Sequence, residues 1–351
     1  MKKTRIIAIG LVLVMLASLL VGCAPKAIEA PAETPATTEA AVETPAAPAL
    51  KAALLVSGLV NDGGYNQNAY EGLKSLEAKG WEIAFTERVA QADQANTMRD
   101  YVKKGFNLIL GNGYEYGDAM TQIGAEAPKV YFAQIGGGAG GTQPNITSGF
   151  TEGSEGGYLA GILAAKITKS NKIGFVGAME IPTIVEAVDF FAGAVKVNNP
   201  SATVTKAYTG SWDDINKGKE AALAQIATGC DVIMGIGDAV DAGAIQACQE
   251  KGVTFIGFAG DFNKLAPDTV ITSIYQNSAK LVNLFADMVS ENKFEAVAGS
   301  YGIDDGIVYF GEWSAKADPT VKAEVLAIQD KIISGELTKD MIIKEIGYTP
   351  R

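Results

Sequence analysis

The sequence contains no histidine among its 351 residues and only three cysteines, Cys23, Cys230 and Cys248. The lack of histidine excludes Ser-His-Asp and Cys-His nucleophilic catalysis, and every metal site that needs an imidazole ligand. Three dispersed cysteines are too few for a zinc cluster or a disulfide framework. Cys230 and Cys248 are therefore interpreted as buried thiols, with a bridge between them as the alternative. Neither a metal nor another cofactor is expected.

Basic residues are also scarce: the chain has 29 Lys and Arg against 40 Asp and Glu, which gives a net charge of −11. A surface of this sign repels phosphate backbones, so nucleic acid is not an expected partner. The 48% hydrophobic and 20% charged content is typical of a globular protein, and the length favours about two domains plus a targeting segment.

The first residues have the pattern of an export signal. Residues 2–5 are basic and residues 6–21 are almost entirely apolar, which predicts a signal peptide over residues 1–22. The segment Leu20-Val21-Gly22-Cys23 resembles the bacterial lipobox, in which the cysteine receives the lipid. A signal anchor, or an ordinary cleaved signal with an accidental cysteine, is the alternative. We expect an exported protein that is lipid-anchored through Cys23 to the outer face of the bacterial cytoplasmic membrane.

A segment rich in Ala, Pro, Thr and Glu follows the cysteine. Residues 23–50 carry almost no large apolar side chains and therefore cannot bury enough surface to fold. This composition predicts a disordered linker between the lipid anchor and the folded part.

From Lys51 onward, strand patterns and helix patterns alternate, which is typical of parallel sheets with helices on both faces. The pattern restarts near Lys172, so two similar lobes are expected. The predicted strands are 52–57, 82–86, 107–111, 129–134, 172–176, 203–208, 231–236, 253–258, 269–274 and 306–310. The predicted helices are 65–79, 92–104, 115–125, 154–168, 182–197, 214–228, 239–251, 277–291 and 319–335.

Polar and aromatic residues follow the first predicted strand. They are Asn61, Asp62, Tyr65, Asn66 and Tyr70. In an open α/β sheet the loops at the carboxyl ends of the strands face the ligand crevice, so these side chains are candidate ligand contacts. The alternative is an ordinary capped turn, for which Asn, Asp and Gly are the usual residues.

Trp212 follows the predicted strand 203–208 and offers a flat apolar face to an aromatic ligand. Tyr70 could supply a second face from the other lobe, which favours this interpretation. In the alternative, Ser211 or Asp213 caps the next helix and Trp212 packs on the lobe surface. A second motif, Gly235-Ile236-Gly237-Asp238, lacks the third glycine of a dinucleotide fingerprint, so a nucleotide cofactor is not indicated.

Several stretches, taken together, resemble the basic-membrane-protein (BMP) family, which is similar to the purine nucleoside receptor lipoproteins of ABC transporters. The resemblance covers residues 51 to about 345. The matching stretches are 61–72, 152–161, 174–177 with 181–182, 210–214 with 217–220, and 231–233 with Gly235 onward.

The resemblance implies a type I periplasmic-binding-protein fold, with two Rossmann-like lobes joined by three hinge crossovers near residues 149–152, 272–276 and 300–305. Each lobe would then be discontinuous in sequence. The N-terminal lobe is expected to contain residues 51–150 plus 275–302, and the C-terminal lobe residues 151–274 plus 303–351.

The family closes its lobes on a purine nucleoside, so the resemblance also implies ligand-binding residues. Tyr70 and Trp212 match the stacking positions, and Asp62 would accept hydrogen bonds from ring or amino N–H groups. The full set of candidates is Asn61, Asp62, Tyr65, Asn66, Tyr70, Gln134, Trp212, Gly237, Asp238, Asp261 and Gln276.

The sequence departs from the family pattern at the expected sugar subsite. Ala259 stands where the family often has an aspartate, and Gln276 stands in place of a lysine. A site that loses groups for binding hydroxyls demands ribose less strictly. A nucleoside, a free nucleobase and another planar molecule without ribose therefore all stay open as ligands.

These observations together predict a monomeric substrate-binding protein that presents its ligand to an ABC permease and makes or breaks no bond. One alternative is a nucleoside-processing enzyme. Without histidine it would need Asp62, Asp238 or Asp261 as its acid or base. The other alternative is a signalling or adhesion lipoprotein with a vestigial pocket.

Overall fold

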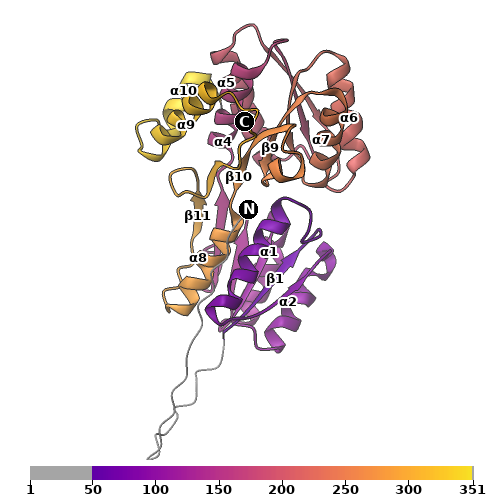
Figure 1. The fold of residues 1–351 in the computed structure, drawn as a ribbon. Helices are drawn as coiled ribbons and strands as arrows, with labels where there is room; N and C mark the ends of the chain where they lie inside the picture. Colours follow the sequence, from indigo (N-terminus) through magenta and orange to yellow (C-terminus); the bar gives the residue numbers. More distant parts are fainter. Residues whose placement is uncertain (1–49, 350–351) are drawn as a thin grey trace, which may run out of the picture. The chain divides into compact units, whose positions relative to one another are not determined.

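The computed structural model describes residues 50–349. The predicted signal peptide, the lipidation site Cys23 and the predicted linker up to residue 49 lie outside the described residues, so these assignments stay predictions. Within residues 50–349 the strands form two six-stranded sheets, each with helices on both of its faces (Figure 1).

The first sheet has the strand order β11-β5-β4-β3-β1-β2, and all of its neighbouring strands are parallel. Its strands are β1 (Lys51–Val56), β2 (Glu82–Thr86), β3 (Leu108–Asn112), β4 (Tyr131–Ile135), β5 (Ile146–Thr151) and β11 (Ala298–Tyr301). Its helices are α1 (Tyr65–Ser75), α2 (Gln94–Lys103), α3 (Gly117–Glu126) and α8 (Ser278–Ser290).

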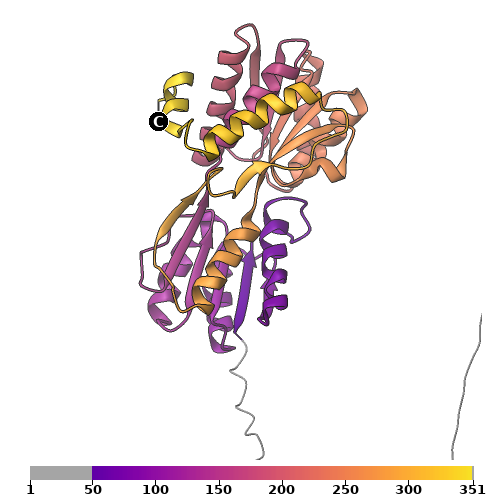
Figure 2. The same cartoon turned by 60° about the vertical axis from the view of Figure 1, so that its left-hand side comes forward.

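Strand β1 shows why a nearly continuous apolar run is needed here. Leu54 and Val56 point to the face covered by α1 and α8, whereas Ala53 and Leu55 point to the face covered by α2 and α3. Because successive side chains of a strand alternate between faces, a strand that is covered on both faces must be apolar throughout. Figure 2 shows α8 beside α1, and the two helices pack closely because Gly72 has no side chain.

The second sheet has the strand order β12-β10-β9-β8-β6-β7 and is parallel except for β12, which runs antiparallel to β10. Its strands are β6 (Lys172–Gly177), β7 (Thr203–Tyr208), β8 (Val232–Ile236), β9 (Thr254–Ala259), β10 (Val270–Gln276) and β12 (Val308–Phe310). Its helices are α4 (Ser154–Ile167), α5 (Pro182–Asn198), α6 (Ile215–Ala227), α7 (Ala239–Lys251), α9 (Pro319–Ile333) and α10 (Lys339–Ile346).

Three connections join the two sheets: β5 to α4, β10 to α8 and β11 to β12. The predicted pair of α/β lobes with parallel sheets and three crossovers is therefore confirmed. The four short 3-10 helices of the described chain are η1 (Glu77–Lys79), η2 (Gln91–Asp93), η3 (Tyr114–Tyr116) and η4 (Phe262–Leu265).

Three elements of the structure were not predicted from the sequence, namely β5, β11 and α10. Strand β5 reads Ile-Thr-Ser-Gly-Phe-Thr, which is too polar to stand out as a buried strand, and β11 has only four residues. Their strand conformation depends on pairing with neighbours rather than on their own sequence.

Two further findings concern the cysteines and the helices. Cys230 and Cys248 are both free and buried, so the alternative of a bridge between them does not hold. A search of the described helices, which covers residues 50–349 only, finds none with the length and apolarity needed to cross a bilayer.

Candidate functional site

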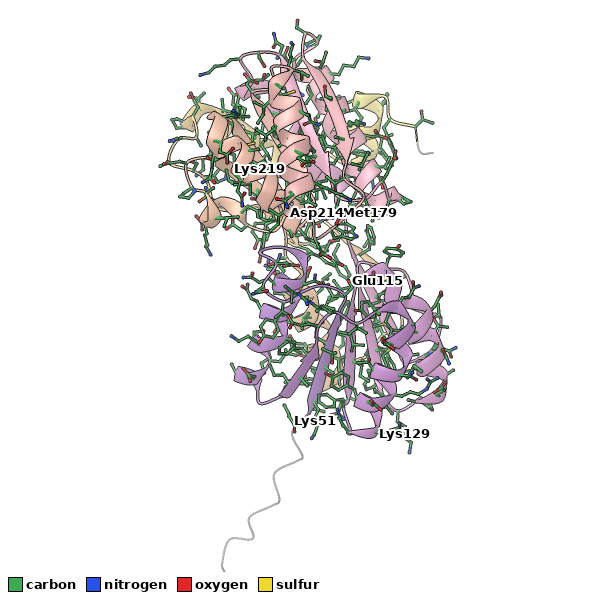
Figure 3. The ribbon with its side chains drawn as sticks, turned by 90° about the vertical axis from the view of Figure 1, so that its right-hand side faces the viewer. Lys51, Glu115, Lys129, Met179, Asp214 and Lys219 are labelled. Atoms are coloured by element: carbon green, nitrogen blue, oxygen red, sulfur yellow. The ribbon has the colours of Figure 1, made fainter. Side chains whose placement is uncertain are left out.

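Loops at the carboxyl ends of strands in both sheets meet each other. The backbone N–H of Tyr65, the first residue of α1, donates to Asp238 Oδ1 in the second lobe at 3.4 Å. Figure 3 shows Glu115 on the edge of the first lobe that faces Met179 and Asp214 of the second lobe. In doubly wound sheets this end of the strands is where ligands bind. The meeting of these loops therefore defines the candidate site.

The side chain of Asp62 accepts hydrogen bonds from N–H groups at the N-terminus of α1. Its Oδ1 accepts from the backbone N–H groups of Gly64 (2.9 Å) and Gln67 (3.1 Å), and its Oδ2 accepts from the backbone N–H and side-chain amide of Asn66 (3.1 and 2.8 Å). Four donors occupy the capacity of one carboxylate. The geometry favours the capped-turn alternative for Asp62 over a direct contact to ligand.

Asn66 continues this internal network. Its side-chain oxygen accepts from Asn112 Nδ2 at 3.0 Å, and Asn66 is itself buried. Together, Asp62, Asn66 and Asn112 tie the loop after β1 to the end of β3. Asn61, by contrast, is exposed at the start of the same loop.

Tyr65 lies where the two lobes meet. Its hydroxyl donates to the carbonyl of Ile135 at 3.1 Å, and a β-carbon on Gly136 would lie only 2.1 Å from that hydroxyl. Glycine at position 136 is therefore required for the tyrosine to reach the end of β4. Burial raises the pKa of Tyr65 above its ordinary range, and the nearby Glu115 and Asp238 add to this rise, so the phenol stays protonated.

Asp238 follows Gly237 and precedes α7. Its φ of 47° lies in the left-handed region, which is uncommon for residues other than glycine and clusters at functional sites. Burial raises the pKa of Asp238 to about 7, and the charges of Asp62 and Asp213 add to this effect against the opposing Tyr65 N–H. Near neutral pH the carboxyl group is therefore present in both forms and can donate or accept a hydrogen bond.

Asp241, one helical turn further along, was not a predicted site residue. It is fully buried, and neither of its carboxylate oxygens has a hydrogen-bond partner among the described residues. Burial raises its pKa well above the ordinary value, and the charge of Asp238 adds to this rise, so the protonated form is favoured. The only sequence signal was its place three residues after Asp238.

Gln134 supports two loops instead of facing open space. Its Nε2 donates to the carbonyls of Gly113 (3.0 Å) and Tyr114 (2.8 Å), and its Oε1 accepts from the N–H of Ala139 (2.9 Å). The residue is 1% exposed. The geometry thus places Gln134 behind the site as a support for the loops after β3 and β4.

The two rings of the expected clamp, Tyr70 and Trp212, make no direct contact with each other. Tyr70 packs against Phe85 of β2, with ring centroids 4.7 Å apart. Trp212 is 37% exposed on the loop after β7. The N-cap of α6 is Asp214, which accepts from the N–H of Lys217 at 3.1 Å, rather than Ser211 or Asp213. Trp212 thus remains a candidate contact, while Tyr70 has a structural partner in its own lobe.

The positions that depart from the family pattern are engaged in protein contacts. Gln276 Nε2 donates to the carbonyl of Thr151 at 3.5 Å, which links two of the crossovers. The carbonyl of Ala259, whose φ is 67°, accepts from Asn68 Nδ2 at 3.0 Å. Asn68 was not among the predicted residues, although it lies within the stretch 61–72 that carries the family resemblance.

A cavity of about 460 Å³ lies beside this contact and is lined from both lobes. Asp261 lines it, and the same carboxylate caps η4 by accepting from the N–H of Asn263 at 3.4 Å. The lining residues are Gly63, Gly64, Gln67, Asn68, Glu71, Asp261, Lys264, Tyr275, Tyr309, Phe310, Gly311, Glu312, Trp313 and Lys322.

Comparison with known proteins agrees with this architecture. The family model Bmp, described as ABC transporter substrate-binding protein PnrA-like, matches residues 49–341. The ABC transporter nucleoside-binding protein BmpA of Lactococcus lactis is 28% identical over 360 residues, covering 96% of this chain and 99% of the relative. A purine-binding protein of Brucella abortus is 28% identical over 292 residues, covering 82% of each chain.

Solved structures show the same fold. A solute-binding protein of an ABC transporter system from Aeropyrum pernix superposes with a TM-score of 0.73 at 20% identity, covering 85% of this chain and 97% of that one. The expected type I periplasmic-binding-protein fold is thereby confirmed.

Proposed function

The chain belongs to the Bmp family of ABC transporter substrate-binding proteins, and from this premise we propose that it captures a purine-type ligand, a nucleoside or a nucleobase, between its two lobes. The observation that carries the proposal is the meeting of Tyr65 and Asp238 from opposite lobes at the carboxyl ends of the two sheets. The nucleoside-binding and purine-binding relatives support the ligand class. An ABC permease is the proposed receiver of the ligand.

The proposed contacts to the ligand are Tyr65, Trp212 and Asp238. A purine presents hydrogen-bond donors and acceptors on one edge and flat apolar faces on both sides, so it needs polar groups and aromatic rings together. Asp238 can offer either hydrogen-bonding role near pH 7, and Trp212 is exposed at the end of its strand. Tyr65 replaces Tyr70 as the proposed aromatic contact from the first lobe, because Tyr70 is engaged with Phe85.

Free nucleobases are proposed as ligands alongside nucleosides. At position 259 the side chain is a methyl group, and the side-chain amide of Gln276 bonds to Thr151. The methyl group at position 259 offers no polar group to the hydroxyls of a ribose, and one N–H of the Gln276 amide is directed to Thr151. A site with fewer such groups loses less when the sugar is missing.

The proposed cellular setting is a monomer anchored to the membrane by a lipid on Cys23. Residues 24–50 would act as the tether, and the folded part would meet the permease outside the cytoplasmic membrane. Replacement of Cys23 by alanine should move the protein from the membrane fraction to the soluble fraction. An unchanged membrane fraction would argue against the lipid anchor.

The ligand is tested by native mass spectrometry of the purified protein, followed by calorimetry with adenosine, guanosine, adenine, guanine and hypoxanthine. A retained mass that equals a base or a nucleoside is the expected result. Absence of binding to every purine, or binding confined to sugars or amino acids, would overturn the proposed ligand class. Release of free base from nucleosides, followed by chromatography, would instead indicate the enzyme alternative.

The proposed contact of Trp212 is tested by Trp212→Ala. Loss of one face of an aromatic pair costs about 1 kcal/mol beyond the loss of buried area, so the affinity should fall by at least about fivefold. Tyr70→Leu is the matched control, because its ring packs on Phe85 within one lobe. This control should lower stability and leave the purine affinity unchanged. Equal affinities for Trp212→Ala and the wild type would exclude Trp212 from the site.

A further inference from the structure

The start of α1 touches the second lobe with backbone alone. A β-carbon on Gly260 would lie 2.5 Å from the carbonyl oxygen of Gly63 and 2.7 Å from Cα of Gly64. Real β-carbons do not approach other atoms this closely, and both of these atoms belong to the main chain, which cannot rotate away as a side chain can. The observed approach of the two lobes therefore depends on the absence of a side chain at position 260.

Asn68 makes a second set of bonds across the same contact. Its Nδ2 donates to the carbonyls of Ala259 (3.0 Å) and Gln276 (3.4 Å), and its Oδ1 accepts from the hydroxyl of Tyr275. Asn68 is 5% exposed. One side chain of the first lobe therefore pairs with three groups on strands β9 and β10 of the second sheet.

The aromatic ring of Phe262 packs against the same contact. Phe262 lies 3.9 and 3.6 Å from where β-carbons on Gly63 and Gly64 would stand. Gly63 has a φ of 76°, which favours glycine, and this conformation lets the loop turn into α1 against the ring. The contact is thus made by protein atoms of both lobes, without any group supplied by a ligand.

We propose that this α1 docking contact, formed by Gly63, Gly64 and Asn68 with Ala259 and Gly260, holds the lobes closed and thereby sets the ligand affinity. Gly260 and Asn68 act as positioning residues that do not touch the ligand. When only the closed form binds tightly, the observed dissociation constant is the intrinsic one divided by the closed fraction. A change that opens the lobes therefore weakens binding in the same proportion. The affinity part of this inference rests on the proposed function, whereas the docking itself does not.

The test uses Gly260→Ala, with Gly138→Ala as the matched control. Gly260 has no positive φ, so alanine fits the backbone of its own lobe, where the added methyl group approaches the movable ring of Phe262 at 3.3 Å. A β-carbon on Gly138 would meet nothing within 4 Å. We expect Gly260→Ala to give a larger radius of gyration in small-angle X-ray scattering than the wild type and Gly138→Ala. We also expect its affinity for purines to fall by about tenfold or more.

Asn68→Ala is the second variant. It removes the bonds across the lobes without adding volume, so we expect a change of the same sign and a smaller size. Thermal unfolding, followed by circular dichroism, identifies any variant that fails to fold. If Gly260→Ala does not fold, the scattering of Asn68→Ala decides the proposal.

The outcomes separate docking from ligand binding. If folded Gly260→Ala has the radius of gyration and the purine affinity of Gly138→Ala, the proposal is overturned. The same holds if Gly260→Ala does not fold and Asn68→Ala scatters like the wild type. If the wild type binds no purine, the proposed function fails, while the scattering comparison without ligand still decides whether the contact closes the lobes.

Discussion

Replacement of Gln134 by methionine tests whether this residue supports loops or contacts ligand. Methionine has a similar length and no strong hydrogen-bonding group, so Gln134→Met removes the polar atoms and nearly preserves the shape. In the structure the amide of Gln134 bonds to Gly113 and Tyr114 on one loop and to Ala139 on another. These loops follow β3 and β4, two strands of the first sheet.

The expected loss of stability follows from the remaining partners. The carbonyls of Gly113 and Tyr114 each keep another donor, the N–H groups of Tyr116 and Gly117, so each loses only one bond, at about 1 kcal/mol. The N–H of Ala139 has no other hydrogen-bond partner among residues 50–349 and would be left unpaired, which costs about 1–3 kcal/mol for a buried donor. The free energy of unfolding should therefore fall by about 3–5 kcal/mol.

The assay is urea denaturation of the folded part, monitored by circular dichroism, with the denaturation midpoint and slope compared between variants. Gln122→Met is the matched control, because Gln122 is exposed on α3 and the same substitution there should change stability by less than about 0.5 kcal/mol. If Gln134→Met unfolds at the midpoint of the control but loses purine affinity, the support role is refuted and a direct ligand contact is indicated.

Three further perturbations test the packing and the buried groups. Burial and the nearby Asp304 raise the pKa of Glu155 from 4.5 to about 7, so the folded state favours the protonated form. The free energy of unfolding therefore decreases as the pH rises through about 7. Glu155→Gln should flatten the pH dependence of the urea midpoint between pH 5 and pH 8. An identical pH profile for Glu155→Gln would contradict this. Gly72→Ala would place a β-carbon 2.6 Å from Cα of Ala279 and should destabilise the fold by about 1–3 kcal/mol in the same assay; wild-type stability would show that α1 and α8 can move apart freely. Burial raises the pKa of the Cys248 thiol to about 12, so iodoacetamide should label it only after denaturation, and rapid labelling of the folded protein, seen by mass spectrometry, would contradict the burial.

The division into two α/β lobes follows from local patterns. Strands such as β1 and β8 are almost entirely apolar because helices cover both of their faces, and such apolar runs can be recognised from sequence alone. Strand β5 escaped prediction because Thr147, Ser148 and Gly149 interrupt its apolar pattern. Its conformation is set by pairing with β4 and β11, and β11 lies far from β5 in the sequence.

The roles of the candidate site residues are harder to predict from sequence than the fold, for a physical reason. Asp62, Asn66 and Gln134 have the right chemistry and lie at the right ends of strands, but a hydrogen bond to a nearby backbone group competes with one to a ligand. The spacing around Asp62 predicts its role, since a carboxylate two residues before the N-cap of a helix reaches the first N–H groups. The spacing around Gln134 does not predict its role, because its hydrogen-bond partners come from two separate loops.

The choice between Tyr65 and Tyr70 also depended on three-dimensional placement. Both tyrosines belong to α1, and their sequence neighbours do not reveal which one faces the second lobe. The structure places Tyr70 on Phe85 and Tyr65 beside Asp238, because the rotation of α1 about its axis is set by its packing against α8 and the sheet.

The sequence by itself determined the architecture of two α/β lobes and the kinds of side chain available to a site. The absence of histidine, the acidic composition and the alternation of strands and helices are properties of residues and of their immediate neighbours, and they need no knowledge of distant contacts. Only the tertiary structure decided how the lobes meet. The approach of Gly260 to Gly63 and the bonds of Asn68 join segments nearly two hundred residues apart in the sequence, on opposite sides of the crossover from β5 to α4. No local propensity encodes such a contact, because it depends on the angle at which two separately folded lobes are held.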